Sequence, residues 1–165
     1  MAEISESAAL QAVEDKLLGL TYLAQAIGTV KAFQAETYKY DHEVAHFITS
    51  NPYNCLWEIF IDENQLVYET VQIGAQRREN LSMRVRATMR RQSTDVNRTL
   101  FHALCETVLR AIAHSDFQGM GLGVAGSGTQ NEQFRCRYSP MVKGTKAVTH
   151  RAEITFRLWN AATQT

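Results

Sequence analysis

The stretch Leu81–Arg90, LSMRVRATMR, alternates apolar and polar side chains without a break. One set consists of Leu81, Met83, Val85, Ala87 and Met89, and the other of Ser82, Arg84, Arg86, Thr88 and Arg90. Successive side chains of a strand point to opposite faces of a sheet. This alternation therefore predicts a β-strand with one face on the core and the other toward solvent.

Further strands are predicted on both sides of this one. They occupy residues 55–62, 66–73, 134–138 and 148–159, where β-forming residues are frequent or apolar and polar residues alternate. The first of them is apolar at most positions of both parities, which is typical of a strand buried on both faces. Residues 62–64 are predicted to form a turn.

Two segments have the periodicity of an amphipathic helix. Apolar residues recur every three or four positions over 10–30, which predicts an N-terminal helix that Gly19 and Gly28 kink or divide in two. A second helix is predicted over 96–112, after the suitable N-cap Asp95. The order α-β-β-β-α-β-β predicts an α+β fold, with a mostly antiparallel sheet and both helices packed on one face. We expect residues 1–165 to form a single domain.

The composition argues against several protein classes. No apolar run approaches the roughly 20 residues of a membrane-spanning helix, and the acidic N-terminus lacks the basic start of a signal peptide. We therefore expect a soluble protein that is made without secretion and contacts no membrane. Cys55, Cys105 and Cys136 are far apart and lack zinc-finger spacing, so we expect them to be reduced and to act as small hydrophobic residues.

Charge is segregated along the chain, although the chain as a whole is neutral. Residues 1–70 contain eleven acidic residues and three lysines, whereas residues 71–165 contain fourteen basic and six acidic residues. A surface of one sign repels itself, so the segregation requires an explanation. The two halves can neutralise each other within one monomer, or the acidic face of one copy can bind the basic face of the next. Both explanations stay open at this stage.

The segment His42-Glu43-Val44-Ala45-His46 matches the H-E-x-x-H pattern of zinc peptidases. On a helix, His42 and His46 would both reach a metal ion, and Glu43 would activate its bound water. The surroundings do not favour this function, because the segment lacks an apolar stripe, Pro52 follows closely, and no third ligand is evident. We predict a polar loop or short helix with surface histidines, and no metal or other cofactor. A small zinc hydrolase that uses His42, Glu43 and His46 is the alternative.

The segment Gly121–Gly126 matches G-x-G-x-x-G. A dinucleotide site needs a strand before this motif and a helix after it, so that the helix N-terminus meets the pyrophosphate. Here a predicted helix precedes the motif and a predicted strand follows it. We therefore predict a flexible loop and no cofactor site.

The arginines of the alternating strand are the main candidate binding residues. Arg84, Arg86 and Arg90 share one face, where they can bind an acidic protein surface, pair within the chain, or contact nucleic acid. The candidate internal partners are Glu69, Glu79 and Glu153. Nucleic acid is the least favoured partner, because no stacking aromatics are interleaved with the arginines. We predict a protein interface at Arg84, Arg86 and Arg90, and a second contact at Lys143 and Lys146 in the polar connection 139–146.

No catalytic set of side chains is predicted. His102 and Cys105 are placed on nearly opposite sides of the second helix, so they do not form a nucleophile–base pair. His150 has the inward parity of the last strand, which predicts a core histidine. We therefore expect a protein without enzymatic activity.

In element order the chain resembles the tail-terminator, or tail-completion, proteins of long-tailed bacteriophages. The matching stretches are Leu10–Val30, Pro52–Ile61 (PYNCLWEIFI), Leu81–Arg90, Asp95–His114 and Gln133–Leu158. The resemblance covers most of the chain and is one of pattern, without a diagnostic motif.

This resemblance implies a structural virion protein that forms a ring, commonly a hexamer, on the head-proximal end of the tail tube. The ring would stop tube growth and join the tail to the head connector. The implied partners are other copies of the chain, the tail-tube protein, in some phages the sheath, and a head-connector or neck protein, with DNA only passing through the ring lumen. Assembly would take place in the host cytoplasm. Another neck component, such as a head-completion or tail-tube protein, is a further alternative.

Overall fold

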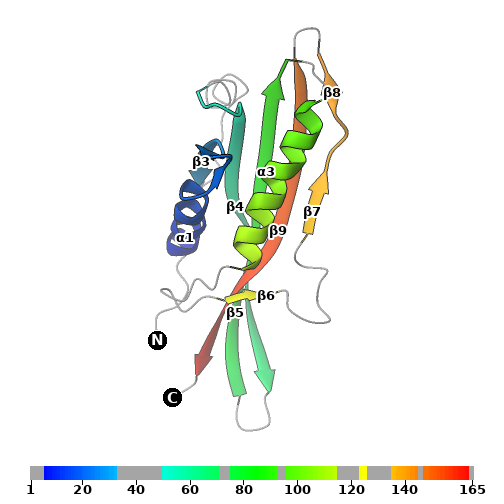
Figure 1. Cartoon of the computed structure of the whole chain (residues 1–165). Coiled ribbons are helices and arrows are strands. Elements are labelled where there is room, and N and C mark those ends of the chain that lie inside the picture. The colour runs from blue at the N-terminus through cyan, green and yellow to red at the C-terminus, as the bar shows by residue number, and fades with distance from the viewer. Residues whose placement is uncertain are drawn as a thin grey trace.

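The protein has an α+β fold, as predicted, in which two helices pack against a mostly antiparallel sheet. The computed structural model describes residues 6–32, 50–70, 75–92, 96–114, 123–125, 135–144 and 147–163. In chain order the elements are α1 (Glu6–Leu18), β1 (Thr21–Tyr22), β2 (Gln25–Ala26), β3 (Thr29–Ala32), β4 (Cys55–Thr70), β5 (Ala75–Arg91), α3 (Val96–Ala113), β6 (Gly123–Ala125), β7 (Arg135–Tyr138), β8 (Val142–Lys143) and β9 (Val148–Thr163) (Figure 1).

The main sheet has the order β3-β4-β5-β9, and β6, β7 and β8 complete it on the far side of β9. These three short strands pair with successive parts of β9, so they form one interrupted edge. All the pairings are antiparallel except that of β3 with β4. Strands β1 and β2 form a separate hairpin between α1 and β3.

The core lies between the two helices and one face of the sheet. The apolar set of β5 is buried, as its alternation predicts, and it packs with buried apolar residues of α1 and α3 in one cluster. The cluster includes Leu10, Val13 and Leu17 from α1 and Leu104, Val108 and Ile112 from α3. Figure 1 shows α3 in front of β5 and β9, while α1 contacts β3 and β4. Strand β4 is buried on both faces at its start, as predicted.

The N-terminal helix is shorter than predicted. It ends at Leu18, and residues 21–32 form the β1–β2 hairpin and β3 instead of a second helical part. The apolar repeat continues past Gly19 because Ile27 and Val30 are buried against the sheet. Gly28 has φ +145°, and a Cβ there would lie 2.5 Å from the Cys55 carbonyl oxygen, so the chain passes close to β4 in a non-helical conformation.

The turn predicted at residues 62–64 is also wrong. Strand β4 continues through these residues to Thr70, and its register with β5 shifts between Ile61 and Glu63. A β-bulge accommodates one extra residue without ending the strand, so the polar run Asp62–Asn64 produced a false turn signal. Two predicted strands are therefore one. In Figure 1, the paired ends of β4, β5 and β9 extend beyond both helices.

Two predicted loops contain strand pairing. The polar connection 139–146 includes β8, and the glycine-rich segment includes β6, each of which pairs with β9. Helix α3 begins at Val96 as expected, whereas its predicted cap Asp95 lies outside the described residues. Among the described helices, none combines the length and the apolarity needed to cross a membrane.

Candidate assembly interface

The predicted arginine stripe lies on the sheet face opposite the helices, and part of it is paired within the chain. Arg84 Nη2 lies 3.2 Å from Asp62 Oδ1, and Arg84 Nη1 lies 3.5 Å from Glu153 Oε1. Arg86 Nε lies 3.6 Å from the same Glu153 oxygen. Both guanidinium groups also lie over the Phe60 ring, at 5.1 and 5.3 Å from its centroid. Internal pairing with Glu153, which the sequence offers as an alternative to a protein interface, is present in the structure.

These pairs bear on the charge segregation. Asp62 belongs to the acidic half of the sequence and Arg84 to the basic half, so their ion pair neutralises the two halves locally within one monomer. The pairs are partly exposed, and such pairs contribute about 1 kcal/mol or less each. An interface at Arg84 and Arg86 stays a prediction, and it would have to form beside these pairs. Arg90, at the end of β5, is exposed.

Several candidate residues lie outside the described part of the chain. They are His42, Glu43, His46, Lys146 and half of the glycine motif (residues 121, 122 and 126). The zinc-hydrolase alternative is therefore not tested, and within the described residues no group of three or more potential metal ligands occurs. The side chains of Glu69 and Glu79 are likewise outside the description.

The interrupted edge of the sheet carries basic and apolar side chains toward solvent. We call residues 135–144 and 147–151 the β7–β8 edge. Its basic residues are Arg135, Arg137, Lys143 and Arg151, and it contains no acidic residue. Tyr138, Met141 and Val142 are exposed to 40%, 43% and 60%. The predicted contact residue Lys143 is exposed here, on β8.

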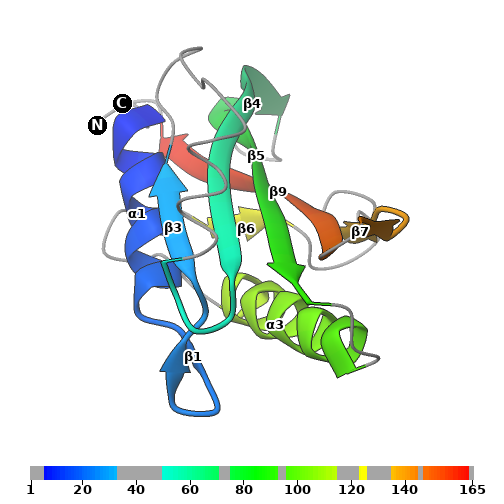
Figure 2. The same ribbon diagram turned by 90° about the horizontal axis from the view of Figure 1, so that it is seen from above.

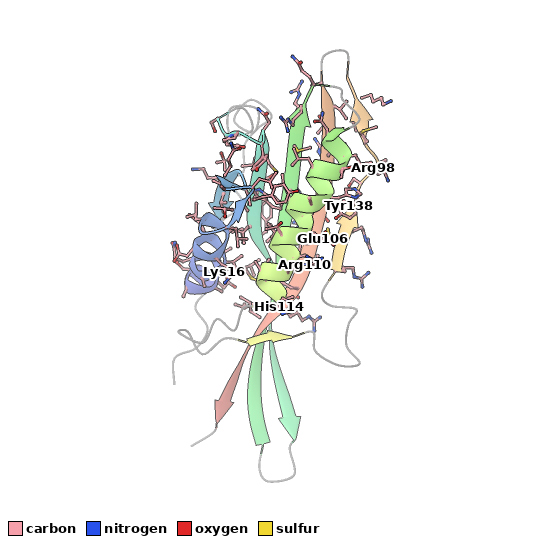
Figure 3. The ribbon with its side chains drawn as sticks, in the orientation of Figure 1. Lys16, Arg98, Glu106, Arg110, His114 and Tyr138 are labelled. Carbon is pink, nitrogen blue, oxygen red and sulfur yellow. The ribbon has the colours of Figure 1, made fainter. Side chains whose placement is uncertain are left out.

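A cavity of about 440 Å³ opens between this edge and the start of α3. Its lining includes Arg98, Phe101, His102, Tyr138, Met141 and His150. Phe101 stacks on His150 with ring centroids 5.4 Å apart, and His102 stacks on Tyr138 at 4.0 Å. In Figure 3 the labelled Arg98 and Tyr138 lie near the same end of α3, whereas Lys16 on α1 lies on the other side of the molecule. The walls are therefore aromatic and the rim is basic.

His150 is the buried polar group of this cavity. Its side chain is 5% exposed, as its predicted inward parity requires, and its Nε2 atom makes no hydrogen bond within the described structure. Burial lowers the pKa of His150, and electrostatic interactions with the nearby His102 and Arg98 side chains lower it further. The imidazole is therefore neutral at pH 7 and has one ring nitrogen without a partner.

Two thiols lie together behind the cavity. Cys105 on α3 and Cys136 on β7 are hydrogen-bonded through their side chains, which lowers the pKa of Cys136 to about 7 and raises that of Cys105. The Tyr138 hydroxyl adds a second hydrogen bond to the Cys136 sulfur. The prediction that His102 and Cys105 lie on nearly opposite sides of α3 is wrong, because residues three positions apart are neighbours on a helix surface. Cys105 is buried, whereas His102 lines the cavity and stacks on Tyr138.

The opposite edge consists of α1, the β1–β2 hairpin and β3, and we call it the α1 edge. Helix α1 carries the acidic residues Glu6, Glu14 and Asp15 and one lysine. Two apolar side chains are exposed here, Leu18 to 56% and Leu23 to 77%. Leu23 and Ala24 form the two-residue turn of the hairpin, with φ angles of +47° and +63°. With Lys31 on β3, the described edge carries three acidic and two basic side chains, so it is only weakly acidic, and it bears an apolar tip.

Comparison with known proteins finds no family model that matches the chain and no curated protein that matches its sequence. The two edges of the sheet, which differ in sign and in shape, are the features from which a function can be inferred.

Sequence reasoning missed both the hairpin tip and the cavity. Two-residue hairpin turns with positive φ usually contain Asn or Gly, so the apolar pair Leu23-Ala24 gave no turn signal. The cavity combines Arg98 and Phe101 of α3 with residues about 40 to 50 positions later in the sequence. The periodicity of single segments contains no information about such a juxtaposition.

Proposed function

We propose that this chain is a structural protein that self-associates into a ring and acts as a bacteriophage tail terminator. In this function the protein acts by assembly and catalyses no reaction. Each copy binds the copy before it through one edge of its sheet and the copy after it through the other edge. The ring caps the head-proximal end of the tail tube and provides a docking surface for the head connector.

The observation that carries this proposal is the complementarity of the two edges. The α1 edge is weakly acidic and exposes Leu18 and Leu23, whereas the β7–β8 edge is basic and exposes Tyr138, Met141 and Val142. The edges are at opposite ends of the strand order, so one copy cannot bring its own two edges together. A contact between different surfaces repeats from copy to copy, and it closes into a ring when the rotation per subunit allows.

The charges also support a role for the basic residues outside the ring contact. Arg90 is exposed and lies outside both edges, and we propose that it faces the tail tube or the next ring. Opposite charges on two partners raise the association rate and select the correct partner more than they add affinity.

Size-exclusion chromatography with light scattering tests self-association directly. We expect the chain to form a discrete oligomer at high protein concentration and low salt, and negative-stain electron microscopy to show closed rings. Rising salt should weaken the oligomer, because exposed charges are screened. A chain that stays monomeric at low salt and high concentration would contradict the proposal.

The terminator role needs a second test. A tail-tube protein encoded next to this chain should polymerise into shorter tubes when the ring is present at low molar ratio, and the ring should appear at one tube end only. Tubes of unchanged length, or rings bound along the tube wall, would argue for a different neck or tail component.

A further inference from the structure

We infer that Cys105 and Cys136 form a redox-active thiol pair, which a small hydroperoxide oxidises to a reversible disulfide between α3 and β7. All the cysteines are free thiols in the structure, and the side chains of these two are hydrogen-bonded to each other. The inference assigns a modification site to the molecule. It goes beyond the proposed ring and does not depend on it.

The first argument is the packing of α3 against β7. His102 stacks on Tyr138 with ring centroids 4.0 Å apart, so this side of α3 faces the strand. Cys105 follows His102 by three residues and lies on the same side of the helix. Cys136 precedes Tyr138 by two residues and lies on the same face of the strand. Figure 1 shows α3 and β7 running in opposite directions, so these two steps lead to the same place and bring the two sulfurs together.

The second argument is the different environment of the two thiols. Cys136 is half-buried, and Figure 2 shows its strand β7 beyond β9, on the side of the sheet away from α1. Its sulfur accepts hydrogen bonds from the Cys105 thiol and the Tyr138 hydroxyl, which lower its pKa to about 7. Cys105 is fully buried behind it. A reactive cysteine is partly exposed and has thiolate character, so Cys136 is the nucleophile and Cys105 the resolving thiol.

The reaction has two steps. The Cys136 thiolate attacks one oxygen of the hydroperoxide, the O–O bond breaks, and the other oxygen leaves as an alkoxide or hydroxide that takes up a proton. Cys136 is then a sulfenic acid. The Cys105 sulfur attacks the Cys136 sulfur, the S–O bond breaks, and the hydroxide leaves as water with the Cys105 thiol proton. Two thiols have lost two electrons in total, and one hydroperoxide has become one alcohol, or water, and one further water.

The third argument is that β7 can accommodate the bond. Hydrogen-bonded thiols are already in contact, so an S–S bond of about 2.05 Å requires only a short further approach. Strand β7 has four residues, Arg135–Tyr138, and it pairs with β9 on one side. A short edge strand can shift by this amount without disturbing the core. The disulfide would then join β7 covalently to the core helix α3.

Peroxide treatment of the folded wild-type chain tests the pair. Low protein concentration and high salt keep the β7–β8 edge free of neighbouring copies in this experiment. After hydrogen peroxide is removed, the chain is unfolded, its remaining thiols are blocked with N-ethylmaleimide, and the adducts are counted by intact mass. We expect two of the three thiols to be lost without dimer formation. Peptide mapping should show a bond between Cys105 and Cys136 that dithiothreitol reverses.

Three variants resolve the two steps. Cys105→Ala keeps the nucleophile and removes the resolving thiol, so the reaction should stop at the Cys136 sulfenic acid, which dimedone traps. Cys136→Ser removes the nucleophile, so Cys105 should stay unmodified at the same peroxide dose. Cys55→Ala is the matched control, because it removes a buried thiol outside the pair and should lose both remaining thiols at the wild-type rate.

The wild-type measurement is decisive whether or not a variant folds. The inference is wrong if the folded wild-type chain keeps every thiol at doses that oxidise a small free thiol. It is also wrong if the disulfide contains Cys55, or if Cys136 proceeds to a sulfinic acid although Cys105 is present. A chain that closes this disulfide but never assembles would contradict the proposed function alone, whereas a chain that assembles and keeps its thiols would contradict this inference alone.

Discussion

The two edges of the sheet are held to the molecule in different ways. The α1 edge is fixed by side chains: the Trp57 indole N–H donates to the Ile27 carbonyl oxygen at 3.0 Å, and the Tyr53 hydroxyl donates to the Tyr22 carbonyl oxygen. Asn51 binds both the N–H and the C=O of Cys55, at 3.1 and 2.9 Å. Residues 135–144 of the β7–β8 edge are attached mainly by backbone pairing to β9, and their side chains are exposed apart from the half-buried Cys136.

Because of this difference, the side chains of one edge are free for the proposed assembly. Side chains of the α1 edge take part in the monomer's own core, whereas those of residues 137–143 contribute little to it. Substitutions at the α1 edge should therefore act first on folding, apart from those at its exposed tip. Substitutions at the β7–β8 edge should act first on association. Four predictions test this contrast, in order of decreasing effect.

The largest effect is expected for Gly28→Ala. The added Cβ would lie 2.5 Å from the Cys55 carbonyl oxygen, and φ is +145°, so β3 would have to move away from β4. Strain and overlap together should lower the free energy of unfolding by about 3 kcal/mol, or the melting temperature by roughly 6–12 °C. Gly19→Ala is the matched control, because its nearest atoms are 3.7 Å from the new Cβ. Equal losses in the two variants would show that the close approach at Gly28 does not hold this edge.

A smaller loss is expected for Trp57→Phe. The substitution leaves the Ile27 carbonyl oxygen without its indole donor in a buried site and removes part of a fully buried ring. Urea unfolding should show a loss of about 2 kcal/mol. The corresponding change on the other edge, Tyr138→Phe, removes a partly exposed hydroxyl and its weak hydrogen bond to the Cys136 sulfur, and it should change stability by less than about 0.5 kcal/mol. Similar losses at the two positions would contradict the contrast between the edges.

The third prediction concerns thiol reactivity at the β7–β8 edge. Because the pKa of Cys136 is lowered to about 7, roughly half of this thiol is ionised at neutral pH, and it should react with iodoacetamide about five- to tenfold faster than an ordinary cysteine. Cys55 and Cys105 are buried, and their pKa values are raised, so they should stay unmodified in the folded protein.

Cys105→Ala is the informative variant for this pair. It removes the hydrogen bond that is the largest cause of the lowered pKa. Cys136 should therefore reach the same alkylation rate only at a higher pH. Mass spectrometry of the modified peptide across pH 6–9 measures this shift. An identical pH profile in the variant and the wild type would exclude the thiol pair as the cause.

The smallest effect is a pH dependence of stability due to His150. Its pKa in the folded state is lowered, so the unfolded chain binds the proton more readily. The stabilising contribution is therefore present above the ordinary histidine pKa of about 6.5 and is lost as the pH falls below it. His150→Phe should flatten the melting temperature between pH 7 and pH 5, whereas the exposed His114→Gln should keep the wild-type slope. An unchanged slope in His150→Phe would show that the imidazole is not the source.

The sequence was sufficient to predict the α+β class, α3 and the alternation of β5. In these segments the apolar residues recur without interruption, and the same residues are buried in the structure. The false turn at Asp62–Asn64 and the overlong first helix arose where local chemistry and tertiary contact disagree. Polar residues in a bulge resemble a turn in sequence. Ile27 and Val30 are spaced as in a helix, although the segment that buries them is not helical. The tertiary environment overrides such local preferences.

The candidate site was less predictable than the fold. Parity places Arg84 and Glu153 on the same sheet face, so their pairing was open to prediction, whereas the cavity depends on how the start of α3 meets residues 138–151. The sequence also contained no sign that Leu23, an apolar residue, is exposed in the described structure.

Strand β9 determines when the chain becomes competent to associate. It is synthesised after every other described strand, and it pairs with β5 on one side and with β6, β7 and β8 on the other. It also provides His150 and Arg151 to the cavity. In the proposed ring, a nascent chain would therefore have no complete β7–β8 edge for another copy until β9 is in place. Oligomerisation of the proposed kind would in this way be delayed until translation has passed β9, which would keep incomplete chains out of the ring.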